Sequence, residues 1–303
     1  MTKPFLTLAA ALCLAAASHA QQPLNVQLGL GRRAVLAQRA GMLFSAQERD
    51  VLLANLQDPD AGVRKAALKS LREYVGQSPY VWQSVMAVLN NVNEKDEVRY
   101  EAVKTLSRVT KYPEVAALLA RYATNPKTPA AFRGIAYKAL YGQAAGNPAV
   151  TALLLQGTSE KEPSKEGMLG AVWALAQASH YPGVAARLML IAANHADMDV
   201  RVAAVRSLYR GAGRPEVFEA LYATAVNGNA APELRYPAIL ALSKVKTPAQ
   251  QEALQLISLR DPNPKMRTAA VMAMDRDDPR IAAYFHMPAM TADGSSVDPL
   301  ENE

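Results

Sequence analysis

The stretch Asp197-Met198-Asp199-Val200-Arg201-Val202-Ala203-Ala204-Val205-Arg206-Ser207-Leu208 decides the fold of this chain. In it, alanine follows Arg201 after three residues and leucine follows after seven, a spacing that puts all three on one stripe of a helix. The pattern occurs seven times, with Met274 in place of leucine in the last copy. The anchor residues lie 32 to 35 positions apart and are Arg64, Arg99, Arg133, Met168, Arg201, Arg235 and Arg267. A fixed period of this length is typical of stacked helical repeats.

A second series of residues has the same period. Each member opens a segment with helical apolar spacing, and the series is Pro79, Pro113, Pro148, Pro182, Pro215, Pro248 and Pro279. Proline is favoured in the first turn of a helix, where its missing N–H would have no partner in any case. Four polar residues directly precede these prolines as predicted N-caps, namely Ser78, Asn147, Thr247 and Asp278. Each repeat is therefore predicted to contain a proline-started helix, a polar turn and a second helix with the anchor.

The turns between the two helices resemble those of HEAT repeats. Asp58-Pro59-Asp60 before Val63-Arg64 and Asp197 to Arg201 carry the resemblance, and Asp261-Pro262 before Met266-Arg267 matches less tightly. The resemblance implies an all-α, right-handed α-solenoid of about seven HEAT-like helix pairs with short capping helices. It also implies a ladder between adjacent repeats, in which Asp60, Asp96, Asp199 and the arginine anchors are structural. The fourth repeat departs from the pattern, because Met168 replaces arginine.

The repeats are predicted to fill residues 46–287. Residues 21–45, which include a predicted short helix from Arg32 to Ala40, form the expected N-terminal cap. A helix beginning at Asp278 is the expected C-terminal cap, because the end repeats of a stack need a covered face. Residues 288–303 are acidic and rich in turn-forming residues, which predicts a disordered tail.

Residues 1–20 have the pattern of a secretory signal peptide. Lys3 precedes an uncharged apolar run from Phe5 to Ala17, and Ser18-His19-Ala20 provides small residues at a cleavage site. The form is bacterial, so we expect a periplasmic protein, with secretion as the alternative. The only cysteine, Cys13, lies in this segment, and no later segment is apolar enough to span a membrane. The mature chain is therefore expected to lack disulfides and thiol chemistry.

The sequence contains no motif that predicts catalysis or a cofactor. No serine elbow or phosphate loop is present, and His195 with Asp197 and Asp199 forms the only cluster of acids around a histidine. A metal site needs three or four converging ligands, so we interpret this cluster as a turn whose acids cap the next helix. We expect a non-catalytic protein without a metal or cofactor. HEAT-like lyases that act on bound pigments are a remote alternative.

The second helices are predicted to carry a row of basic residues, which we call the basic lane. It comprises the positions five and nine residues after each anchor, on the side of the helix opposite the apolar stripe. Eight of these fourteen positions are basic and one, Glu73, is acidic. The second helices line the concave surface in HEAT folds, so the resemblance implies a basic concave groove, with Trp173 near its middle and Tyr100, Tyr141, Tyr209 and Tyr236 at its flanks. The predicted binding residues are Lys69, Lys104, Arg108, Lys138, Trp173, Arg206, Arg210 and Lys244.

Two functions fit such a groove, and an ordinary solvated face remains the alternative to both. The first is a scaffold or adaptor that binds an acidic segment of another envelope protein. The second is binding of an anionic polymer such as lipopolysaccharide or a polysaccharide. Export makes nucleic acid a poor candidate, although the net charge is +6, or +5 without Lys3. The acidic tail could also occupy the groove within the same chain.

Overall fold

The computed structural model describes residues 46–159, 162, 164–275 and 277–286. The chain divides into two compact units, Met1–Val51 and Leu52–Glu303. Residues 46–51 of the first unit are helical, and Arg49 forms an ion pair of 2.7 Å with Asp50. The predicted signal peptide (1–20), N-terminal cap (21–45) and acidic tail (288–303) lie outside the described residues.

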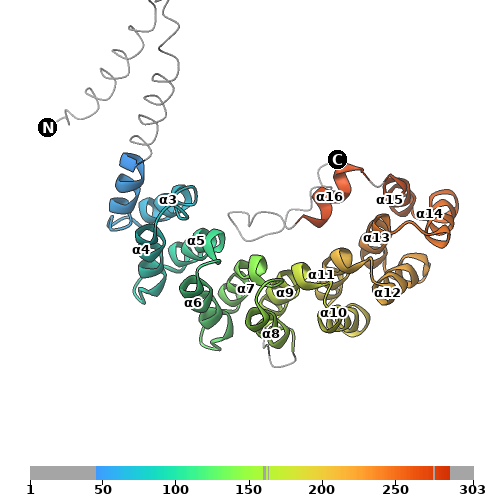
Figure 1. Cartoon of the computed structure of the whole chain (residues 1–303), viewed down its shortest axis with the longest axis horizontal. Helices are drawn as coiled ribbons and strands as arrows, with labels where there is room; N and C mark the ends of the chain where they lie inside the picture. Colours follow the sequence, from blue (N-terminus) through green and yellow to red (C-terminus); the bar gives the residue numbers. More distant parts are fainter. Residues whose placement is uncertain (1–45, 160–161, 163, 276, 287–303) are drawn as a thin grey trace, which may run out of the picture. The chain divides into compact units, whose positions relative to one another are not determined.

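The second unit is a stack of helix pairs in two rows (Figure 1). The second helices of the pairs form the row on the inner side of the stack, and they are α3 (Ala61–Leu71), α5 (Asp96–Leu106), α7 (Ala130–Ala139), α9 (Lys165–Leu175), α11 (Met198–Ser207), α13 (Pro232–Ala241) and α15 (Pro264–Met274). The other row contains the first helices, α4 (Pro79–Asn90), α6 (Pro113–Thr124), α8 (Pro148–Gly157), α10 (Pro182–Asn194), α12 (Pro215–Val226) and α14 (Pro248–Arg260). All regular structure in the described residues is helical, which confirms the predicted α-solenoid.

The predicted prolines begin the helices as expected. Every helix from α4 to α14 in the outer row, and α16 (Pro279–Phe285) after the last pair, starts at the proline named from the sequence. The side chains of Asn147, Thr247 and Asp278 accept hydrogen bonds from backbone N–H groups of the first turn. Ser78 stands at the N-cap position of α4, but its side chain makes no capping hydrogen bond, so that part of the prediction was wrong.

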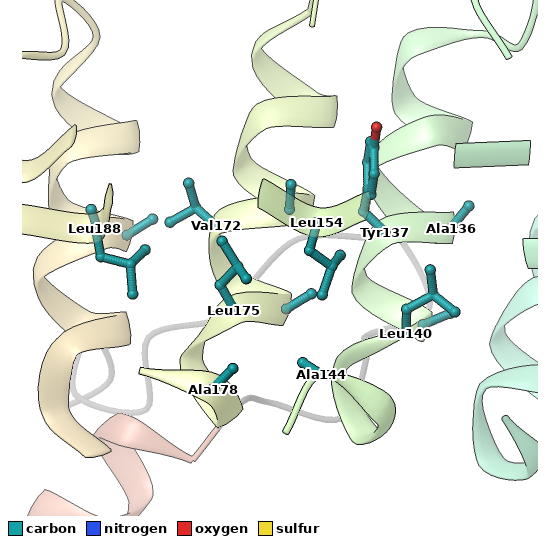
Figure 2. Close-up of a cluster of buried hydrophobic side chains, with 14 of the residues drawn as sticks. Ala136, Tyr137, Leu140, Ala144, Leu154, Val172, Leu175, Ala178 and Leu188 are labelled. Carbon is teal, nitrogen blue, oxygen red and sulfur yellow. The ribbon is translucent and has the colours of Figure 1, made fainter. Parts of the chain in front are cut away.

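The core lies between the two rows. Leu154 of α8, Leu175 of α9 and Leu188 of α10 are fully buried and lie between the helices in Figure 2. The apolar stripe of the second helices is buried in the first six repeats, as its spacing predicts. In the last repeat, Val271 and Met274 remain 56% and 44% exposed, contrary to the prediction, because within the described residues no further repeat follows α15.

The small residues six positions after the anchors allow close packing and also join neighbouring repeats. The buried hydroxyl of Thr105 donates a hydrogen bond of 2.9 Å to the carbonyl oxygen of Leu68 in the preceding repeat. Ser207 donates in the same way to Val172, at 3.1 Å. Each bond satisfies a buried hydroxyl, which would otherwise cost about 1–3 kcal/mol.

The arginine anchors are structural, but their acidic partners differ from the predicted ones. Arg64 pairs with Glu94 of the next repeat at 2.6 Å, and Arg133 pairs with Glu162 of the next repeat at 2.9 Å. Arg235 likewise forms a buried ion pair with Asp261. Partners in the next repeat thus come from the turn that precedes each second helix.

The three predicted acids have other roles. Asp60 caps its own helix by accepting a hydrogen bond from the N–H of Gly62, and Asp96 pairs with Arg99 within α5 at 3.3 Å. Asp199 pairs with Lys165 of the preceding repeat, as does Asp197. The predicted ladder between repeats is therefore confirmed for Arg64, Arg133 and Arg235, whereas Arg99, Arg201 and Arg267 bond within their own repeats. Asp60 and Asp96 are structural without joining repeats, and Asp199 joins repeats through a lysine.

The fourth repeat is held by backbone contact. A Cβ on Gly170 of α9 would lie 2.2 Å from the carbonyl oxygen of Gly134 in α7, and a Cβ on Gly134 would lie 2.4 Å from that of Glu166. Glycine at both positions lets the two helices approach more closely than any side chain permits. This contact stands where Met168 replaces the arginine anchor.

Candidate functional site

The five-after-anchor positions of the basic lane bring several cations together on the inner row. Lys69 of α3 is exposed, Lys138 of α7 and Arg206 of α11 are half-buried, and Lys104 of α5 is only 5% exposed. Trp173 of α9 is half-buried and packs against the core. In the last two repeats, Leu240 and Met272 are buried, so they do not belong to an exposed face. The cationic part of this row is therefore confined to α3, α5, α7 and α11.

Lys138 is the least compensated cation in this group. Burial lowers its pKa, and the positive charges of Lys104 and Arg206 lower it further. Among the described residues it has no hydrogen-bond or ion-pair partner. A buried cation that is repelled by two others is unfavourable for the folded state and favours the approach of an anion.

Arg206 lies between two aromatic rings. Its guanidinium carbon is 4.7 Å from the ring centroid of Trp173 and 4.2 Å from that of Tyr284 in α16. One terminal nitrogen donates a hydrogen bond of 2.5 Å to the carbonyl oxygen of Tyr284, whereas the buried Nε has no partner in the described structure. Trp173 thus lies against one cation of the basic lane, Arg206.

The nine-after-anchor positions do not continue the α-helices. Arg108, Arg210 and Lys244 lie in the short 3-10 helices η1 (Ser107–Val109), η4 (Leu208–Gly211) and η5 (Leu242–Lys244). Arg108 is 3.7 Å from Glu73 and both side chains are largely exposed. Arg210 is exposed, and Lys244 lies over the ring of Tyr209 at 4.6 Å. These residues form a separate, more solvated edge, and Arg276 lies outside the described residues.

The helix α16, predicted as an end cap, contacts α15 and also packs against aromatic residues of the inner row. Its Phe285 stacks on Tyr209 at 3.8 Å between ring centroids, and Tyr284 contacts Tyr236 at 5.5 Å. Figure 1 shows α16 on the inner side of the stack, next to α15. Because α16 follows the last helix pair and contacts α15, it has the position expected of a C-terminal cap, and its aromatic pair at 284–285 also reaches residues further back in the stack. Two of the predicted flanking tyrosines, Tyr209 and Tyr236, contact the aromatic residues of α16.

The inner row also contains a pocket with acids that the sequence analysis missed. It has a volume of about 360 Å³ and is lined by Lys65, Glu97, Tyr100, Glu101, Lys104, Ala131, Gly134, Ile135, Lys138, Glu166 and Leu169. The predicted basic groove therefore also contains acids here, because three glutamates accompany three lysines. These glutamates stand two residues before or after the anchors. Both positions line the pocket on the inner row, but the basic lane was defined by the residues five and nine after each anchor.

The cluster around His195 is a turn, in agreement with its interpretation. Asp197 caps α11 by accepting hydrogen bonds from the N–H groups of Asp199 and Val200, and its own N–H donates to Nδ1 of His195 at 3.1 Å. Within the described residues, no three histidine, cysteine or acidic side chains gather as they would around a metal ion. The same part of the chain has no helix with the length and apolar character needed to cross a membrane.

Comparison with known proteins places these features in a family. The family model of HEAT repeats matches residues 49–140 and 185–275, which together are more than half of the chain. The unmatched interval contains the repeat in which methionine replaces the arginine anchor. No curated protein sequence matches the chain.

Three solved structures are similar at low identity. Human deoxyhypusine hydroxylase in complex with glycerol is 18% identical over 90% of this chain and 99% of that one, with a TM-score of 0.36. The complex of CpcE and CpcF of phycocyanin lyase from Nostoc sp. PCC7120 is 17% identical over 78% and 92%, with a TM-score of 0.45. The Mot1 N-terminal domain in complex with TBP is 14% identical over 94% and 41%, with a TM-score of 0.47. On the family match over most of its repeats, the chain belongs to the HEAT-repeat family.

Proposed function

We propose that the protein is a non-catalytic scaffold of the bacterial envelope that binds an acidic segment of another protein along its inner row. The observation that supports this most directly is the group of Lys104, Lys138 and Arg206, in which like charges act on one another at a half-buried surface. A protein rarely retains such an arrangement for stability, because it costs free energy unless an anion approaches. The wider property of HEAT repeats, which generally mediate protein interactions, agrees with this function.

Aromatic side chains favour a protein partner over a polymer. Trp173 is half-buried beside Arg206, and tryptophan and arginine are the residues that most often dominate protein interfaces. Binding of an anionic polymer such as lipopolysaccharide or a polysaccharide would depend on charge alone and would weaken steeply with salt. The positive charges of the exposed Lys69, Arg108 and Arg210 favour this second candidate, binding of an anionic polymer.

Export to the periplasm is part of the proposal and rests on residues 1–20. The sequence Ser18-His19-Ala20 supports cleavage before Gln21. N-terminal sequencing of the protein from its native host tests this directly. A chain that begins at Gln21 in the periplasmic fraction supports export, and an uncleaved chain in the cytoplasm contradicts it.

The binding surface is tested by placing a photo-crosslinking residue at Lys69 on the inner row or at Leu259, which is 79% exposed on α14 of the outer row. In a periplasmic extract, the Lys69 position is expected to capture a discrete protein band that the Leu259 position does not. The band should disappear in a variant with Lys138→Met and Trp173→Ala. Equal capture at the two positions would overturn the proposed surface.

A charge-matched control separates a specific surface from net charge. Lys69→Glu with Lys138→Met lowers the net charge of the inner row by three, because it removes two positive charges and adds one negative charge. Lys127→Glu with Arg260→Gln removes the same charge from exposed positions outside it. Only the first variant should lose the partner. If both lose it equally, and if the loss follows the salt concentration, polymer-like charge binding is the better account.

A further inference from the structure

The pocket on α7 exists because small residues face inward there. Gly134 stands at the position where the flanking helices carry Tyr100 on α5 and Leu169 on α9. Ala131 stands at the position where they carry Glu97 and Glu166. The side chains on α5 and α9 are large, whereas the residues of α7 at these positions are glycine and alanine. Gly134 cannot be enlarged, since a Cβ would meet the carbonyl oxygen of Glu166 at 2.4 Å. The helix contact that joins the third and fourth repeats therefore also leaves this hollow open.

Half of the charged side chains that line the pocket are neutralised by ion pairs within the protein. Lys65 and Glu97 form an ion pair of 3.2 Å, and Glu101, which is buried, is paired with Arg72. Lys138 lines the pocket and has no hydrogen-bond or ion-pair partner in the described residues. Ile135 and Leu169 supply apolar wall beside it.

We propose that this pocket binds a carboxylate with a small apolar body, whose anionic group pairs with Lys138 and whose body packs against Ile135 and Leu169. The inference rests on the proposed function where the carboxylate is the side chain or terminus of the acidic segment. A free small organic acid carries the same chemistry, and the test below separates the two sources.

Charge and size restrict the ligand to this class. The lining contains three lysines and three glutamates, so it suits a single negative charge better than a phosphate dianion, which the glutamates would repel. Its volume of about 360 Å³ is near the lower end of small-molecule sites and fits one side chain or a small acid. A bound carboxylate would also relieve the repulsion that lowers the pKa of Lys138.

The test uses fluorine NMR of 4-fluorophenylacetate with the mature chain. Its uncharged analogue 4-fluorophenylacetamide and the dianion 4-fluorobenzyl phosphate serve as probes of the same ring. The acetate should bind saturably. The acetamide should bind at least about tenfold more weakly, because it loses one charge-assisted hydrogen bond. The phosphate should also bind at least about tenfold more weakly, because the glutamates repel its second negative charge. Lys138→Met and Ala131→Leu, which fills the hollow without changing a charge, should each abolish binding, whereas Lys127→Met should not.

The outcomes of these measurements show whether the carboxylate comes from a protein segment or a free acid, and they can also disprove the proposed carboxylate site. If the blocked peptide acetyl-Phe-Glu-Phe-amide displaces the acetate, the source is a protein segment. If it does not, the source is a free acid. Equal binding of acetate and acetamide, or unchanged acetate binding in Ala131→Leu, would overturn the site. The partner band in the Lys69 crosslinking experiment distinguishes the two proposals. If the Lys69 position captures a partner and the acetate does not bind, the pocket is rejected and the scaffold is kept. If the acetate does not bind and no variant captures a partner band, both proposals are rejected.

Discussion

Arg206 donates a hydrogen bond to the backbone oxygen of Tyr284, a residue 78 positions further along the chain. This contact fixes α16 on the inner row, beside the cations of the candidate binding surface. The helix α16 therefore covers part of the candidate binding surface of the same chain. Any partner that approaches α11 meets an arginine that is already held between two rings.

Tyr284→Ala should release α16 without unfolding the stack. Tyr284 is 3% exposed, and removal of a large buried aromatic side chain costs about 3–5 kcal/mol. Because repeat proteins are stabilised by near-neighbour contacts, the loss should stay local. Hydrogen exchange should show lost protection in α16 and little change in α5 to α9. The exposed Tyr80→Ala serves as the control, and a general loss of protection in the first variant would show that α16 is part of the global folding unit.

Lys138→Met should stabilise the protein while it weakens binding. The substitution removes a cation that is half-buried and repelled by its neighbours, and its gain should be about 0.5–2 kcal/mol in urea unfolding. The exposed Lys127→Met should have no effect. A destabilised Lys138→Met variant would show that the lysine is compensated in the folded state.

The same lysine predicts a pH dependence. Its pKa is lowered from the ordinary value of 10.5 by burial and by Lys104 and Arg206, so the folded state releases this proton at lower pH than the unfolded chain does. Between the lowered pKa and 10.5, the unfolded state binds more protons, and the free energy of unfolding rises with pH. This rise should be absent in Lys138→Met. Urea titrations of both proteins across this alkaline interval measure the difference, and parallel curves would contradict the assignment.

Asp261→Asn should be far more harmful than Asp199→Asn. Burial alone would raise the pKa of Asp261, but the hydrogen bond and charge of Arg235 prevail and lower it, and both side chains of this pair are 5% exposed. Removing one charge of a buried pair costs about 3–5 kcal/mol. The pair of Asp199 and Lys165 is largely exposed and should contribute less than about 1 kcal/mol. Equal urea midpoints for the two variants would contradict this order.

Gly170→Ala should destabilise the stack through a single methyl group. Its Cβ would lie 2.2 Å from the carbonyl oxygen of Gly134, which is backbone and cannot rotate away. Overpacking of this kind costs about 1–3 kcal/mol. Gly183→Ala in α10 meets nothing within 4 Å and should instead stabilise by about 0.5–1 kcal/mol, because alanine is the better helix former. Thermal unfolding followed by circular dichroism compares the melting temperatures of the two variants with that of the wild type. A shift of the same sign in both variants would contradict the prediction.

The sequence predicts the repeat architecture well because each repeat depends on contacts close in the chain. Alanine and leucine at fixed distances from an anchor, such as Ala204 and Leu208, are buried as their spacing requires. The partners of the arginines were less predictable, since Glu94 and Glu162 lie in turns whose length and geometry differ between repeats. The position of α16 could not be read from periodicity, because it depends on Tyr284 and Phe285 meeting residues of distant helices. The glutamates of the pocket could have been found by counting the positions two residues either side of each anchor.

The backbone contact between α7 and α9 has a mechanical consequence. Junctions held by long ion-paired side chains, such as Arg64 with Glu94, can lengthen slightly before they break, because those side chains rotate and solvent replaces their bonds. Gly134 and Gly170 have no side chains to extend, so their junction resists small displacement and then fails abruptly. If the stack is pulled from its two ends, the junctions near the ends should therefore lengthen first. The junction between α7 and α9 should transmit the force with little extension.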